Sequence, residues 1–122
     1  MDEKYGHDQL KALIERGHFA RAAFLAASIG LGQEELQKIR YKALTQMAAQ
    51  YRNAPGTKSL AIEYGLSKKE VQVLLEKYAE ELREGNNRKS LEPCYDHRAG
   101  QHLSFQEWLD QLLKHWNKLS TS

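Results

Sequence analysis

The chain has 122 residues and a formal net charge of +2 at pH 7, with 41% hydrophobic and 28% charged residues. This length favours one domain, or one domain with a tail, and is enough for a single hydrophobic core. The nearly balanced charge argues against a protein covered with basic residues for nucleic-acid binding, and leaves only a local basic patch for that role.

Cysteine content and hydropathy indicate the cellular compartment in which the protein is expected to reside. Cys94 is the single cysteine, which excludes an intramolecular disulfide framework and is typical of a reducing environment. The first ten residues are polar and acidic, unlike a secretory signal peptide. No apolar run reaches the ~20 residues of a transmembrane helix. We therefore expect a cytoplasmic location and no membrane partner.

The first predicted helices lie between residues 8 and 29. Asp8 is a natural N-cap for a helix with one apolar side, and Gly17 ends that helix. Residues 1–7 are expected to be frayed. An alanine-rich helix follows over 18–29, and its GHFARAAFLA run resembles the turn of a tetratricopeptide hairpin, which is a helical interaction module.

A longer helix is predicted after a glycine turn. Gly30 and Gly32 interrupt the pattern, and an apolar stripe with helical spacing then runs through residues 33–52. The stripe consists of Leu36, Ile39, Ala43, Leu44 and Met47. The Asn-Ala-Pro-Gly run at 53–56 breaks the helix.

Residues 57–76, TKSLAIEYGLSKKEVQVLLE, have the layout of two helices joined by a tight turn. Ala61 is small enough for the helices to cross closely, and Gly65 suits the positive φ of a sharp turn. Ser67 and Glu70 have the spacing of a capping box at the start of the second helix. The apolar face of that helix is formed by Val71, Leu74, Leu75, Tyr78 and Leu82.

A second copy of this pattern lies upstream. The run FLAASIGLGQEELQKI at 24–39 aligns with SLAIEYGLSKKEVQVL at 59–74, which indicates an internal repeat. Matching residues include the pairs Ala26 and Ala61, Gly30 and Gly65, and Glu35 and Glu70. The second helix begins with a lysine pair in the downstream copy alone, so that copy is better suited to contact phosphate.

This arrangement of alanine, turn glycine and branched apolar residue resembles the helix-turn-helix DNA-binding superfamily at 57–76, and more weakly at 22–41. The resemblance implies that the second helix enters the major groove of DNA. It assigns the base and phosphate contacts to Ser67, Lys68, Lys69, Gln72 and Val73. Arg88 and Lys89, just past this helix, are expected to add backbone contacts.

The C-terminal third consists of an irregular stretch and a last helix. We expect a helical domain over 1–87, a loop or linker over 88–103, and an amphipathic helix over 104–119 packed on the same domain. Trp108, Leu112 and Trp116 share the apolar face of that helix. This face either closes the core or pairs with a second copy of the chain or another protein.

Residues with metal-binding or catalytic chemistry do not form a recognisable site. Cys94, His97 and His102 are close in sequence, but their spacing does not fit the common zinc modules. A phosphate-cradling glycine loop and a catalytic carboxylate pair are also missing from the sequence. We therefore predict no metal, no cofactor and no enzymatic activity.

Together these patterns predict an all-α protein, a compact bundle of about five or six helices with two tandem helix-turn-helix-like hairpins. The predicted function is that of a small DNA-binding protein, a transcriptional regulator, which binds double-stranded DNA through its second hairpin. The alternative is a non-enzymatic protein-interaction module built on the same helical scaffold. A basic surface around Lys68 favours the first function, and a mixed surface with an exposed apolar strip favours the second.

Overall fold

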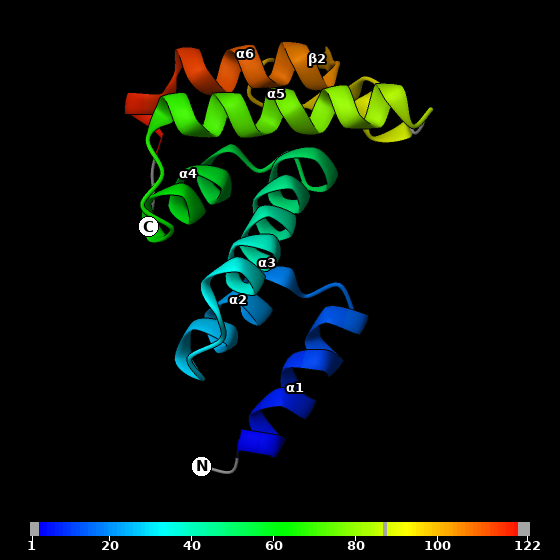
Figure 1. The fold of residues 1–122 in the computed structure, drawn as a ribbon. Coiled ribbons are helices and arrows are strands. Elements are labelled where there is room, and N and C mark those ends of the chain that lie inside the picture. The colour runs from blue at the N-terminus through cyan, green and yellow to red at the C-terminus, as the bar shows by residue number, and fades with distance from the viewer. Residues whose placement is uncertain (1–2, 87, 120–122) are drawn as a thin grey trace. The chain divides into compact units, whose positions relative to one another are not determined.

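The computed structural model describes residues 3–86 and 88–119 (Figure 1). Within these ranges the chain forms six α-helices and one two-stranded sheet, which confirms the predicted all-α class. No described helix is long and apolar enough to cross a membrane. The contacts divide the chain into two units, residues 1–46 and 47–122, and this division falls inside the range 1–87 that the sequence assigned to one domain.

Unit 1 begins with α1 (Glu3–Glu15), which starts before the predicted cap at Asp8. Asp8 therefore lies inside the helix, and residues 3–7, expected to be frayed, are helical; Met1 and Asp2 lie outside the described residues. Gly6 allows a close approach within this helix, because a Cβ at this position would lie 3.0 Å from Ile29 Cγ2. The helix ends as predicted at Gly17, which has a φ of +76°.

The rest of unit 1 is a hairpin of α2 (Phe19–Ser28) and α3 (Gln33–Thr45), which pack against each other. Small side chains let the two helices approach closely. The buried side chains of the pair are Ala22, Ala23 and Ala26 on α2, and Leu36, Ile39, Ala43, Leu44 and Thr45 on α3. The Gln46 amide donates a 2.8 Å hydrogen bond to the carbonyl oxygen of Gly17, which fixes the end of α3 to the α1–α2 turn.

The helix predicted over 33–52 is interrupted. The α-helical part ends at Thr45, and a π-helical turn, η1 (Gln46–Gln50), follows. The Thr45 hydroxyl donates to the carbonyl oxygens of Tyr41 and Lys42, and the Asn53 amide reaches back to the carbonyl oxygen of Met47. Arg52 then adopts a φ of +49°, which no helix continues through.

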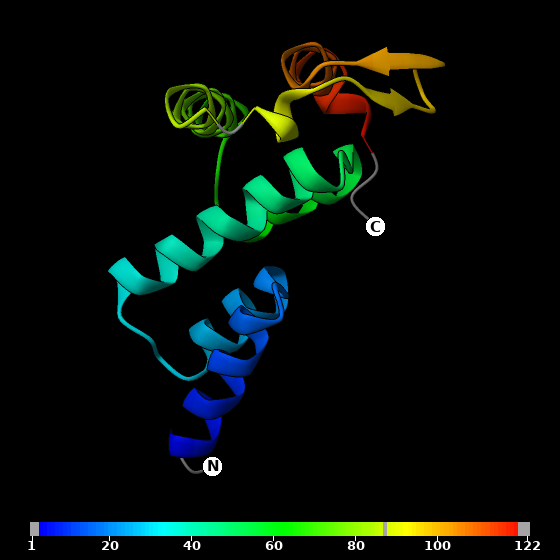
Figure 2. The same cartoon turned by 90° about the vertical axis from the view of Figure 1, so that its right-hand side faces the viewer.

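Unit 2 contains α4 (Ala54–Glu63), α5 (Lys68–Glu84), the 3₁₀ turn η2 (Lys89–Leu91), strands β1 (Cys94–Asp96) and β2 (Gln101–Leu103), α6 (Phe105–Lys114) and the 3₁₀ turn η3 (Trp116–Lys118). Helices α5 and α6 run side by side in opposite directions in Figure 1, and Figure 2 looks along both axes. The largest fully buried side chains of the unit are Phe105, Leu75, Leu109, Val71 and Thr57.

The range 88–103, expected as a loop or linker, contains a β-hairpin. Strands β1 and β2 pair antiparallel, with Cys94 opposite Leu103 and Asp96 opposite Gln101. The turn closes through a 2.8 Å hydrogen bond from the Gly100 amide to the Asp96 carbonyl, at a Gly100 φ of +68°. Strands of three residues are too short for alternating hydrophobicity to reveal them.

The last helix begins as expected at residue 104, with a capping box in which Ser104 and Glu107 exchange hydrogen bonds of 3.1 and 2.9 Å. The α-helix ends at Lys114 and η3 continues it to Lys118. Trp108, Leu112 and Trp116 are all buried. The apolar face of α6 therefore lies in the core of unit 2, which is the first of the two roles considered for it.

Candidate nucleic-acid interface

The turn between α4 and α5 has a defined hydrogen-bond pattern. The Leu66 amide donates to the carbonyl oxygen of Ala61 at 2.8 Å, and the Gly65 amide donates to that of Ile62 at 3.1 Å. Together with a φ of +72° at Gly65, this is the glycine-ended helix terminus known as the Schellman motif. It ends α4 and leaves only Leu66 and Ser67 between the turn glycine and α5.

The turn between α2 and α3 in unit 1 repeats this pattern. The Leu31 amide donates to Ala26 at 2.9 Å, the Gly30 amide donates to Ala27 at 3.2 Å, and Gly30 has a φ of +73°. The helices differ, however: α2 packs extensively against α3, whereas α4 and α5 make few contacts with each other. The two copies therefore share a turn and differ in how closely their helices pack.

Helix α5 begins at a complete capping box. The Ser67 hydroxyl oxygen accepts from the Glu70 amide at 3.1 Å, and the Glu70 carboxylate accepts from the Ser67 amide at 3.0 Å. The hydrogen bonds from the Ser67 backbone and side chain lower the pKa of Glu70 below its usual value. The first turn of α5 is thereby fixed, together with the directions of the side chains it carries.

Most of the side chains predicted to contact DNA lie together on the first two turns of α5. Lys68 and Lys69 are exposed, Val73 is 54% exposed, and Gln72 is half-buried. Within the described part of the chain neither lysine forms an ion pair. We call Ser67, Lys68, Lys69, Gln72 and Val73 the α5 face.

Charge along α5 changes sign after these turns. The exposed acidic residues of the later turns are Glu76, Glu80, Glu81 and Glu84. Two of them pair within the helix, since Lys77 lies 4.0 Å from Glu81 and Arg83 lies 3.4 Å from Glu80. Arg88 and Lys89 are exposed beyond the far end of α5, about 25 Å from its start. They therefore do not form one patch with the α5 face.

Arg52 is a key residue that the sequence patterns did not single out. Its guanidinium donates to the carbonyl oxygens of Ala49 at 3.2 Å and of Leu103, Ser90 and Glu92 at 3.1 Å, and it lies 5.5 Å from the ring centroid of Phe105. Burial lowers its pKa, and electrostatic interaction with the nearby Asp96 acts in the opposite direction. Arg52 joins η1, η2 and β2, and no motif could have predicted its contacts with Ser90, Glu92 and Leu103, because these residues are distant in sequence.

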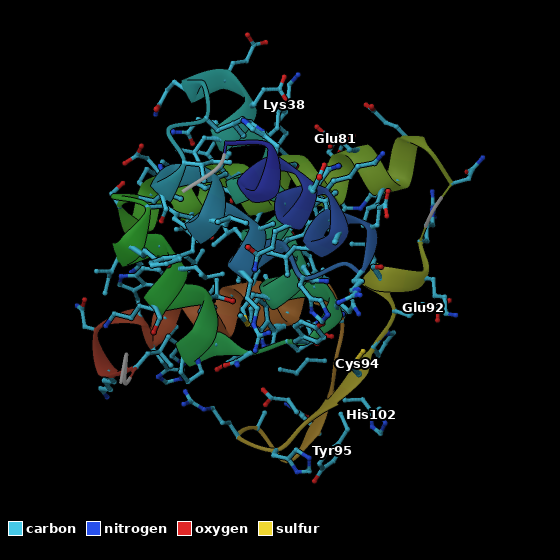
Figure 3. The ribbon with its side chains drawn as sticks, turned by 90° about the horizontal axis from the view of Figure 1, so that it is seen from below. Lys38, Glu81, Glu92, Cys94, Tyr95 and His102 are labelled. Atoms are coloured by element: carbon cyan, nitrogen blue, oxygen red, sulfur yellow. The ribbon has the colours of Figure 1, made fainter. Side chains whose placement is uncertain are left out.

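The residues considered for a metal site do not converge. Cys94 is exposed, and its Sγ donates weakly to the Glu92 carbonyl oxygen at 3.6 Å. Tyr95 makes edge contacts with the rings of His97 at 5.0 Å and His102 at 5.4 Å, and Figure 3 shows Tyr95 and His102 on the hairpin. Among the described residues no three His, Cys, Asp or Glu side chains are placed to hold a metal ion.

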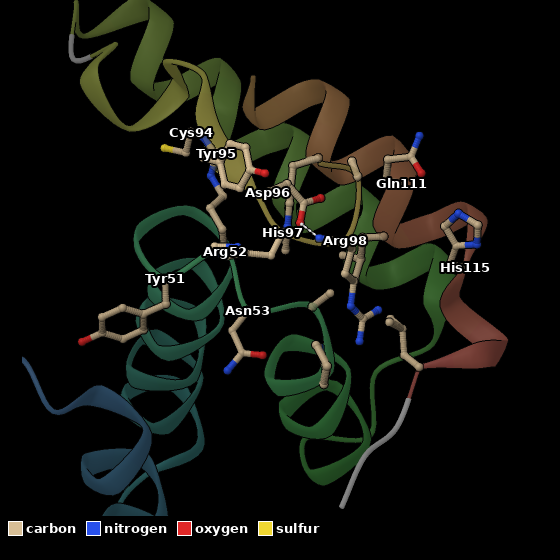
Figure 4. A pocket seen from close by; sticks show the side chains of 16 residues that line it. Tyr51, Arg52, Asn53, Cys94, Tyr95, Asp96, His97, Arg98, Gln111 and His115 are labelled. Atoms are coloured by element: carbon tan, nitrogen blue, oxygen red, sulfur yellow. Dashed lines mark hydrogen bonds between the residues drawn. The ribbon is translucent and has the colours of Figure 1, made fainter. Parts of the chain in front are cut away.

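A pocket of about 370 Å³ lies within unit 2, beside the hairpin turn (Figure 4). Segment 51–55, the turn 96–99 and α6 form its walls. It is separate from the α5 face, because no residue of α5 lines it.

Comparison with known proteins adds no family. No protein-family model, curated protein or solved structure matches this chain. The functional argument therefore depends on the α5 face and on the pocket, both of which belong to unit 2.

Proposed function

We propose that this protein binds double-stranded DNA and acts as a transcriptional regulator, with the start of α5 in the major groove. The observation that carries the proposal is the α5 face. On the first two turns of this capped helix it presents Gln72, Val73 and two lysines that form no ion pair with any described residue. An α-helix of 10–12 Å diameter fits the ~12 Å major groove. Helix-turn-helix proteins read bases from this part of their second helix.

The side chains of the α5 face suit several kinds of contact. Gln72 matches the hydrogen-bonding edge of adenine, and the exposed Val73 suits the methyl group of thymine. Lys68 and Lys69 are placed for phosphate oxygens or the acceptor edge of guanine. The acidic residues of the later turns favour a pose in which only the start of α5 lies in the groove, because they would repel phosphates along the rest of the helix.

The lysine pair supplies the first test. We expect the full chain to bind a mixed-sequence duplex of about 20 base pairs at low salt, with affinity that falls as salt rises, because binding phosphates releases counterions. Lys68→Gln with Lys69→Gln should weaken binding at least tenfold and reduce the salt dependence by about two released ions. Fluorescence anisotropy at several salt concentrations measures both effects.

A matched pair controls for net charge. Lys114→Gln with Lys118→Gln removes two exposed lysines near the end of α6 and should leave the affinity within twofold of the original. An equal loss in both double variants would show unspecific attraction to charge. The absence of binding to the original chain at low salt would overturn the proposal.

A protein-interaction role is the second candidate, and one observation favours it. Phe24 on α2 is 68% exposed, which leaves a large aromatic side chain on the surface of unit 1. Exposed aromatic residues are enriched at binding hot spots. Because the α6 side chains considered for this role are buried, a protein partner would use the Phe24 surface.

A further inference from the structure

The pocket in unit 2 has the size of a small-molecule site. Its volume of about 370 Å³ falls in the range of about 300–1,000 Å³ that such sites occupy. Figure 4 shows that the lining side chains come from three separate segments, with Tyr51 and Asn53 on one side, Asp96 to Arg98 on another, and Gln111 and His115 on α6.

The buried part of the pocket lining, which we call the floor, is apolar. It consists of Trp108, Leu112 and Leu119, all of which are buried. Ala54 and Pro55, in the first turn of α4, add further apolar surface. A flat hydrocarbon body that lies on this surface would remove apolar area from water on both sides, which favours binding.

The charge around the pocket is positive on balance. Two arginines, Arg52 and Arg98, line it against a single aspartate, Asp96. Arg52 donates four hydrogen bonds to backbone carbonyls, and the charge of Asp96 stabilises its cationic form. Asp96 also accepts a 3.1 Å hydrogen bond from the Arg98 backbone amide.

Arg98 is therefore the cation at the pocket that has no counterpart. Its side chain is exposed and makes no hydrogen bond or ion pair with any described residue. In Figure 4 it extends from the hairpin turn along the opening of the pocket. A guanidinium binds a carboxylate through two parallel hydrogen bonds, which suits an anionic group held at this opening.

From these observations we propose that the pocket binds a small organic anion, a carboxylate attached to a flat apolar body. The apolar body lies on the floor formed by Trp108, Leu112 and Leu119, and the carboxylate pairs with Arg98. Gln111 and His115 of α6 also line the pocket and supply polar contacts. This binding site is independent of the α5 face and of DNA.

Binding is tested on the full chain by two-dimensional ¹H–¹⁵N NMR, with sodium benzoate as the probe. We expect saturable shifts of the backbone amides around Arg98, Ala54 and Gln111, with a Kd of about 1 mM. Benzamide has the same body without the charge, and acetate has the charge without the body. Each should bind at least fivefold more weakly than benzoate.

Arg98→Gln provides the decisive variant. It retains the backbone amide that bonds Asp96, so the hairpin should keep its spectrum, and benzoate affinity should fall at least fivefold. Arg21→Gln is the matched control, because Arg21 is an exposed arginine on α2 in unit 1. The affinity of this variant for benzoate should equal that of the original chain.

Three results would overturn the proposal. The first is the absence of saturable shifts up to about 10 mM benzoate. The second is binding of benzamide as tight as that of benzoate, and the third is an unchanged affinity for benzoate in Arg98→Gln. None depends on DNA binding, so this proposal and the proposed function can fail separately.

Discussion

Arg52 holds together parts of unit 2 that are far apart in the chain. Its four hydrogen bonds link η1 to the residues on either side of the hairpin, and its cation faces the buried ring of Phe105. It has no carboxylate within salt-bridge distance among the described residues. Backbone carbonyls therefore compensate its burial, and removal of the side chain would leave several of them without a donor.

We expect Arg52→Ala to lower the free energy of unfolding by about 3 kcal/mol, since hydrogen bonds from a charged donor are lost together. Arg52→Lys should lower the free energy of unfolding by nearly as much, because one ammonium cannot reach four carbonyls in the directions that the planar guanidinium uses. Urea unfolding followed by circular dichroism measures both changes. The exposed Arg88 serves as control, and Arg88→Ala should stay within about 0.5 kcal/mol. A similarly small change in Arg52→Ala would contradict this role.

The residues of the α5 face could be identified from sequence, whereas Arg52 and Arg98 could not. The start of α5 is fixed by residues within three positions of each other, so its outward side chains follow from helix geometry alone. Arg52 depends on carbonyls 38 to 51 residues away. The position of Arg98 depends on a short β-hairpin, which lies in the range that we expected to be a loop or linker.

At the level of elements, a capping box begins both α5 and α6, and each involves a carboxylate. Glu70 and Glu107 each accept a hydrogen bond from the amide of the serine three positions earlier. Backbone and side-chain hydrogen bonds from Ser67 and Ser104 lower the pKa of each glutamate. Local signals of this kind are readable from sequence, but the π-helical turn after Thr45 is not, because the apolar spacing continues through it.

The lowered pKa values predict a dependence of stability on pH. A carboxyl whose pKa is lower in the folded state stabilises the fold above its unfolded pKa, and this stabilisation is lost as the pH falls through its folded pKa. We therefore expect part of the loss of stability below about pH 4.5 to come from Glu70 and Glu107. The double variant Glu70→Gln with Glu107→Gln keeps an oxygen acceptor at each cap and removes the titration.

Thermal unfolding of this double variant between pH 3 and pH 7 tests the effect. Its melting temperature should fall less steeply with acid than that of the original chain. Glu34→Gln with Glu84→Gln changes two exposed glutamates for which no capping hydrogen bond is present, and it should keep the original slope. Identical slopes in all three proteins would show that the caps do not contribute.

At the scale of the whole molecule, the division after Gln46 separates the two copies of the repeat. The all-α class followed from helical spacing along most of the chain, but the boundary lies inside one apparent helix and has no composition signal. Both repeats keep the same turn, yet only unit 2 adds a hairpin and a last helix, and it carries both the α5 face and the pocket.

The residues that shape the α5 face lie within unit 2, and this leads to a prediction about fragments. Residues 47–122 contain the buried Val71 and Leu75 of α5, the α6 side chains that pack in the same unit, and Arg52 with all its carbonyl partners. We expect this fragment to unfold cooperatively, since domains of about 55–65 residues can fold alone. It should bind the mixed-sequence duplex within about threefold of the full chain, because the proposed contacts all lie in it.

The fragment 1–86 provides the opposite case. It contains α4, α5 and the full α5 face, but it lacks α6, which packs beside α5, and three of the carbonyl partners of Arg52. Val71 and Leu75 would then lose part of their apolar cover, so α5 should give poorly dispersed NMR signals and the fragment should bind DNA at least tenfold more weakly. Equal binding by both fragments would show that the first turns of α5 need only their capping box, and not the core of unit 2, to present the α5 face.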